Sequence, residues 1–124
     1  MSERVSINSC INLDELEELA GRILPAKSFD YYRGGACDER TLTENREAYG
    51  RIKLRPRMLR DVSSIEKKLT LFDCELSSPI MVAPMAFQML AHKEGELATA
   101  RAAASSPTMM TVSTLSTYSL EEVK

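Results

Sequence analysis

Apolar residues recur every three or four positions through the first half of the chain, which is the spacing of one helix face. The pattern predicts a helix over 13–23, and Asn12 is placed to cap it with Glu15 three positions later. Pro25 ends this helix and opens a second one over 26–33, since proline suits a first helical position.

A third helix is expected to follow the glycine pair that stops the second. Asp38 is a suitable cap for it, and it should end before Gly50. Farther along, 69–72 and 75–76 have the character of short strands around a turn at Asp73-Cys74.

Two apolar runs in the second half are typical of buried parallel strands, Ile80–Ala83 and Met109–Ser113. A strong helix pattern lies between them over 94–105. Its expected apolar face consists of Leu97, Ala100 and Ala104. Ser119 should cap a last helix with Glu122 at its third position.

The order of these elements predicts an α/β fold. We expect one domain segment over 1–124, with N-terminal helices as a lead-in over about 12–68. The start of a (β/α)₈ TIM barrel then follows over about 69–124, with its first two β/α units. Such a barrel needs ~200 residues or more, so the predicted barrel is incomplete.

Composition adds mainly exclusions. Hydrophobic residues make up 44% and the net charge is −2, so we expect no nucleic-acid partner and no anionic membrane surface. No apolar run approaches the ~20 residues of a membrane span, and the polar start lacks a secretion signal, which favours an intracellular protein. Three scattered cysteines predict neither a disulfide framework nor a zinc site, so no metal is expected. One basic cluster is interpreted as a solvated connection: Arg51, Lys53, Arg55, Arg57 and Arg60.

Five segments, in order and with matching spacing, resemble the FMN-dependent 2-hydroxy-acid oxidases and dehydrogenases. This family includes glycolate oxidase, lactate oxidase and flavocytochrome lactate dehydrogenase. The segments are Phe29–Asn45, Lys53–Val62, Pro79–Ala86, Ala91–Ala102 and Thr111–Val123. The chain is similar only to the N-terminal portion of such an enzyme.

The resemblance implies FMN on the C-terminal face of a TIM barrel. A small 2-hydroxy acid would be oxidised to a 2-oxo acid, and an oxidase would pass the electrons to oxygen to give peroxide. Dehydrogenase relatives use a quinone or a haem domain instead. The resemblance also implies a homo-oligomer, located in peroxisomes in a eukaryote and in the cytoplasm otherwise.

Two residues are candidates for binding substrate. By resemblance, the hydroxyl of Tyr31 binds the substrate carboxylate, and Leu115 lies beside the substrate side chain, where glycolate oxidases typically have tryptophan. A phenol suits the first role, because its ring packs while its hydroxyl donates a hydrogen bond. The alternatives are helix packing for Tyr31 and barrel packing for Leu115.

The candidate cofactor-binding residues follow the two predicted barrel strands. They are Ala83, Pro84, Met85, Ala86 and Ser113. By resemblance, the backbone of the first four passes along the flavin, with the Ala86 amide at its N5/O4 edge, and Ser113 hydrogen-bonds the ring. Met85 departs from the threonine common in the family. The alternatives are an ordinary turn and a plain strand-end serine.

No catalytic residue is expected in this chain. His92 is the only histidine, but it matches one in the first strand–helix loop, whereas the family's base lies downstream. The carboxylate-binding arginines and the flavin lysine also lie downstream, so the chain alone is expected to be inactive. Two other interpretations stay open: a truncated, non-enzymatic binding or regulatory protein, and another FMN barrel enzyme.

Overall fold

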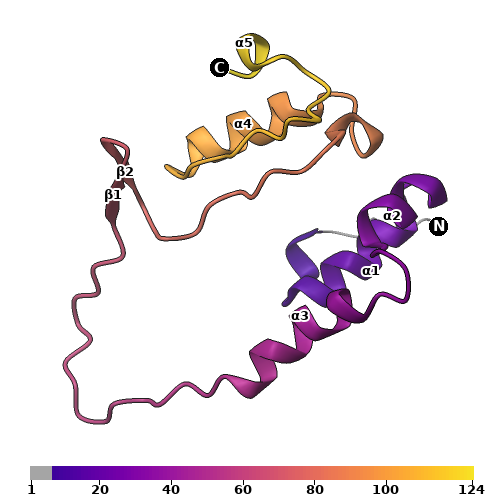
Figure 1. Ribbon diagram of the computed structural model, residues 1–124. Helices are drawn as coiled ribbons and strands as arrows, with labels where there is room; N and C mark the ends of the chain where they lie inside the picture. The colour runs from indigo at the N-terminus through magenta and orange to yellow at the C-terminus, as the bar shows by residue number, and fades with distance from the viewer. Residues whose placement is uncertain (1–6) are drawn as a thin grey trace. The chain divides into compact units, whose positions relative to one another are not determined.

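The computed structural model describes residues 7–124, which divide into two compact units between Arg57 and Met58 (Figure 1). The first unit is helical. The second contains a β-hairpin, two helices and the segments on either side of one parallel bridge. No helix in the described part of the chain is long and apolar enough to cross a membrane.

The first unit confirms the three predicted helices. After a 3₁₀ turn, η1 (Ile7–Ser9), its elements are α1 (Leu13–Ile23), α2 (Ala26–Arg33) and α3 (Arg40–Arg51). The Asn12 side chain accepts a hydrogen bond from the Glu15 N–H at 2.9 Å, which is the predicted cap of α1. Leu19 is buried on this helix.

The ends of α3 differ from the prediction. The residue before its first turn is Glu39, not Asp38, and it has left-handed backbone (φ 55°) with no side-chain cap. Its carboxylate accepts instead from the Gly35 N–H at 2.9 Å, which closes the loop between α2 and α3. The helix also continues through Gly50 to Arg51, because a single glycine costs only ~1 kcal/mol in a helix interior.

The second unit begins with an antiparallel hairpin of β1 (Leu69–Leu71) and β2 (Cys74–Leu76). Its two-residue turn is Phe72–Asp73, one position earlier than predicted, and both residues have positive φ (49° and 60°). Two positive φ values are what a tight hairpin turn requires, since they match the twist of the strands.

The two apolar runs come together as parallel segments, as predicted, but only at one bridge, Val82↔Met110. The Val82 N–H donates to the Met109 carbonyl at 2.9 Å, and the Thr111 N–H donates to the Val82 carbonyl at 3.0 Å. The expected burial is wrong for Ile80, which is 75% exposed, while Val82, Met109 and Met110 are half-buried. A parallel strand is buried only when neighbours cover both of its edges and faces, and the described residues supply one neighbour.

The remaining elements are η2 (Gln88–Leu90), α4 (Gly95–Ser105) and α5 (Leu120–Val123), and Ser119 and Glu122 form the predicted capping box of α5. On α4 the predicted apolar face is only partly right, since Leu97 and Ala100 are half-buried. The buried residues are Gly95, Glu96 and Ala103, while Ala104 is exposed. Gly95 has φ +40°, and a Cβ there would lie 2.9 Å from the Met89 side chain, so glycine permits the close approach of α4 to η2.

Candidate functional site

Two loops leave the parallel bridge in the same direction and are joined to each other. The first covers residues 83–87 and the second 113–117. The Phe87 N–H donates to the Leu115 carbonyl at 3.0 Å. Phe87 has left-handed backbone (φ 51°), which turns the first loop into η2. The structure thus brings together all the predicted cofactor residues and Leu115.

The first loop presents backbone on its surface. Ala83, Pro84 and Met85 are exposed and Ala86 is half-buried. Pro84 has no N–H, and the Ala86 N–H donates no hydrogen bond to any other residue between 7 and 124. A half-buried donor without an internal partner is available to a ligand. The small Ala86 side chain lets a flat group approach that donor.

Ser113 gives the second loop a hydroxyl donor. Its Oγ accepts from the Leu115 N–H at 3.1 Å, and its carbonyl accepts from the Ser116 N–H at 3.0 Å. A hydroxyl that accepts one bond keeps its own proton to donate. Leu115, two residues after Ser113, is 54% exposed and offers an apolar surface.

Glu96 lies beneath both loops, at the start of α4. Its side chain is fully buried at 0% exposure, and its Oε1 accepts from the Gln88 N–H at 3.1 Å and from the Thr117 N–H at 3.0 Å. Gln88 is also buried, and its Oε1 accepts from the Thr99 hydroxyl at 2.5 Å. Both loops are therefore held against α4 by hydrogen bonds to its side chains.

The environment of Glu96 keeps it ionised. Burial of the carboxylate raises its pKa, but the N–H groups of Thr117, Glu96 itself and Gln88, with the Ser116 hydroxyl, lower it by more. The net result is a pKa below the ordinary 4.5. The buried group is therefore a carboxylate near neutral pH, and each of its bonds is charge-assisted.

Sequence reasoning missed Glu96 as part of the site. The helix pattern over 94–105 was judged by its apolar residues three or four positions apart, and no role was given to Glu96. One signal was present, since Glu96, Thr99 and Ala103 share the face that packs. A carboxylate in the first turn of a helix, on the same face as small residues, can be a buried acceptor.

Among the described residues, the His92 side chain contacts only the neighbouring turn. It is exposed, and its Nδ1 accepts from the Glu94 N–H at 3.2 Å in the turn before α4.

Tyr31, the remaining candidate, belongs to the first unit. It lies on α2, is 48% exposed, and meets the Tyr32 ring edge-on at 5.4 Å between centroids.

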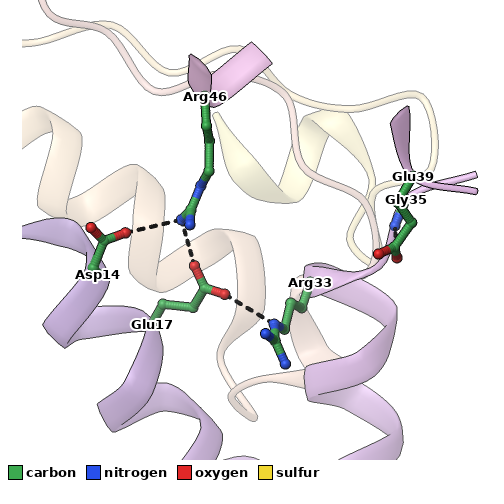
Figure 2. A network of polar contacts seen from close by, with 6 residues as sticks. All are labelled: Asp14, Glu17, Arg33, Gly35, Glu39 and Arg46. Carbon is green, nitrogen blue, oxygen red and sulfur yellow. Dashed lines mark hydrogen bonds and ion pairs between the residues drawn. The ribbon is translucent and has the colours of Figure 1, made fainter. Parts of the chain in front are cut away.

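The helices of the first unit are tied by ion pairs centred on Glu17 of α1 (Figure 2). Glu17 contacts the Arg33 Nε on α2 at 3.2 Å and the Arg46 Nη2 on α3 at 2.7 Å. Arg46 also contacts Asp14 at 3.2 Å.

The two loops follow one parallel bridge and rest on the start of α4. The chain belongs to the FMN-dependent dehydrogenase family, whose model matches residues 20–124. The resemblance noted in the sequence is therefore confirmed, and so is FMN as the cofactor of the family.

Three relatives illustrate the similarity. An L-lactate oxidase of Nostoc sp. is 59% identical over 118 residues, 95% of this chain and 32% of that protein. A peroxisomal (S)-2-hydroxyacid oxidase of Arabidopsis thaliana is 48% identical over 117 residues, 94% of this chain and 32% of that protein. The crystal structure of mandelate oxidase matches with a TM-score of 0.88 and 42% identity, over 93% of this chain and 34% of that one. The chain spans about a third of the length of these relatives.

The residues present fit one side of a flavin. The isoalloxazine ring is flat and carries hydrogen-bond acceptors along one edge. The loops offer the Ser113 hydroxyl and the Ala86 N–H, which has no partner among residues 7–124. Exposed Ala83 and Pro84 leave room for a planar ring against backbone.

Proposed function

We propose that this chain is the front part of an FMN-dependent enzyme that oxidises a small 2-hydroxy acid to a 2-oxo acid and passes the electrons to oxygen. The names of relatives at 48% and 59% identity, a 2-hydroxyacid oxidase and a lactate oxidase, support the reaction class. The observation that carries the proposal is the pair of joined loops with donors at Ala86 and Ser113.

The proposal assigns a role to each candidate residue. The backbone of Ala83–Ala86 lies along the flavin, with the Ala86 N–H toward its N5/O4 edge, and the Ser113 hydroxyl donates to the ring. Tyr31 binds the substrate carboxylate and Leu115 contacts the substrate side chain. FMN, when bound, accepts the two electrons removed from the substrate.

The same proposal covers the wider architecture. Residues 12–68 are the helical lead-in and 69–124 the start of a (β/α)₈ barrel, and the parallel bridge Val82↔Met110 supports this order. We propose a homo-oligomer, located in peroxisomes if the organism is eukaryotic and in the cytoplasm otherwise. The match to a relative named as peroxisomal supports the first location.

The 124-residue chain by itself should be inactive, because removal of the substrate hydroxyl proton needs a positioned base and the matching histidine lies outside it. Its FMN binding should be weak as well, since neutral contacts contribute only ~1 kcal/mol each. Turnover of lactate above a no-protein control, or a low-micromolar FMN dissociation constant for this chain, would contradict the proposal.

The decisive experiment starts from the reading frame after Lys124. If it continues, the complete product is purified and tested for bound FMN and for peroxide formation with lactate and glycolate. Ser113→Ala should weaken FMN binding about fivefold, the loss of one hydrogen bond of ~1 kcal/mol. Ser105→Ala, the same change at an exposed position of α4, serves as control. A stop codon at Lys124 in the gene would instead favour a non-enzymatic binding or regulatory protein.

A further inference from the structure

The two candidate flavin loops meet at a single atom, Oε1 of Glu96. The first loop leads directly into Gln88, the first residue of η2 and two residues after Ala86, and the Gln88 N–H donates to this oxygen. The second reaches it through the Thr117 N–H, four residues after Ser113. The Ala86 N–H and the Ser113 hydroxyl are the two donors proposed to face the flavin. Each therefore lies on a segment whose far end is hydrogen-bonded to Oε1 of Glu96.

The other contacts do not fix the loops in the same way. The bridge at Val82 and Met110 lies before both loops, and the bond from the Phe87 N–H to the Leu115 carbonyl joins them directly near their middle. Both segments are short loops with exposed residues, and segments of this kind open most readily. Without a second connection, each loop could shift relative to the other.

The burial of Glu96 argues that the contact is strong. The side chain is 0% exposed, so water does not compete for Oε1. Hydrogen bonds to an ionised acceptor are roughly twice as strong as neutral ones. The start of a helix also stabilises a negative charge, and Glu96 is the second residue of α4.

We propose that Glu96 is a positioning residue, whose carboxylate sets the Ala86 N–H and the Ser113 hydroxyl at a fixed separation by binding both loops. It contacts neither substrate nor flavin and acts through the two loops. The hydrogen bonds from both loops to Glu96 are present in the structure whatever the function of the chain. Its consequence for the flavin rests on the proposed function.

The test compares Glu96→Gln with Glu94→Gln in the complete FMN enzyme. Glutamine keeps the size of residue 96 and an acceptor oxygen but removes the charge. Glu94 is a matched control, because it lies two positions away, is exposed, and pairs with Arg101 rather than with the loops. The first readout is residue-resolved hydrogen exchange, and the second is the visible absorption spectrum of bound FMN at saturation.

In Glu96→Gln the amides of Gln88 and Thr117 should exchange about tenfold faster, since two charge-assisted bonds become neutral. The amides of Val82 and Thr111, which bond at the bridge, should keep their wild-type rates. The absorption maximum of the bound flavin should shift, since its two donors move relative to each other. Glu94→Gln should change none of these quantities.

Each other outcome counts against the proposal. Unchanged exchange at Gln88 and Thr117 would show that Glu96 does not hold the loops. Equal acceleration at all four amides would show ordinary destabilisation. Selective acceleration with an unchanged flavin spectrum would overturn the positioning role. An enzyme that binds no FMN would refute the proposed function, while the exchange arm would still decide whether Glu96 joins the loops.

Discussion

In each unit a glutamate among residues 7–124 joins several elements, and these two glutamates do so in different ways. Glu17 of the first unit is 34% exposed and binds the guanidinium groups of Arg33 and Arg46, at the ends of long side chains (Figure 2). Glu96 of the second unit is fully buried and binds two backbone N–H groups.

The difference concerns what each carboxylate fixes. Flexible, solvated arginine side chains can follow small movements of a helix, so exposed ion pairs contribute little, about 0.2–1 kcal/mol each. A backbone N–H has no such freedom, and losing its buried acceptor leaves it unsatisfied at a cost of about 1–3 kcal/mol. The first unit is therefore held loosely by Glu17, and the loops of the second are held firmly by Glu96.

The largest expected effect is that of Glu96→Ala in the second unit, and Glu17→Ala is the matched change in the first unit. Glu96→Ala should lower the free energy of local opening at Gln88 and Thr117 by about 3 kcal/mol in all, since the buried Gln88 N–H and the part-buried Thr117 N–H both lose their acceptor. Glu17→Ala should lower the opening free energy of the α1 amides by less than about 1 kcal/mol. Residue-resolved hydrogen exchange measures both quantities. Comparable losses in the two units would remove the contrast.

Helices were predicted well because the signals are local. The Asn12 cap and the Ser119–Glu122 capping box lie within four residues of the bonds they make. The burial of Ile80–Ala83 was wrong because it depends on neighbours that the pattern of one segment does not specify. The hairpin turn moved by one residue because Phe72 accepts a positive φ that its residue type disfavours.

The site was predicted in part. The resemblance located the loop residues, and the structure groups Ala83–Ala86 with Ser113 and Leu115. Glu96 was missed because its partners, the Gln88 and Thr117 amides, are backbone groups that leave no mark in the sequence. A contact between a side chain and distant backbone, eight and 21 residues away, needs the fold to be seen.

The next largest effect is expected for Tyr31. It would show that both units contribute to substrate binding in the complete enzyme. Tyr31→Phe in the first unit should reduce kcat/KM about tenfold for every 2-hydroxy acid, since a hydrogen bond to a charged carboxylate contributes about 1.5 kcal/mol. Tyr32→Phe, the same change at the neighbouring ring, should have little effect. Equal losses in both variants would assign both tyrosines to helix packing.

Leu115 in the second unit should alter preference rather than overall rate. Replacing an indole by an isobutyl group opens space for substrate carbons, and each buried methylene contributes ~0.8 kcal/mol, roughly a three- to fourfold preference. We expect the complete enzyme to prefer lactate or longer acids to glycolate, and Leu115→Trp to shift preference toward glycolate. Leu120→Trp on α5 is the control. The measurement is kcat/KM for three acids, and a wild-type optimum at glycolate would contradict the role.

The smallest expected effect is the salt dependence of the first unit. Glu17→Gln should weaken protection of the α1 amides by about 0.5 kcal/mol at low ionic strength, because two partly exposed ion pairs are lost. In 1 M salt the Debye length is ~3 Å, so wild type and variant should converge. Glu18→Gln should behave like wild type throughout, since its 3.9 Å pair with Arg22 is solvated on both sides.

Protection of Gln88 and Thr117 should not respond to the same salt, because water and ions do not reach buried Glu96. If it falls in parallel with the α1 amides, the two carboxylates hold their units in the same way and the contrast fails.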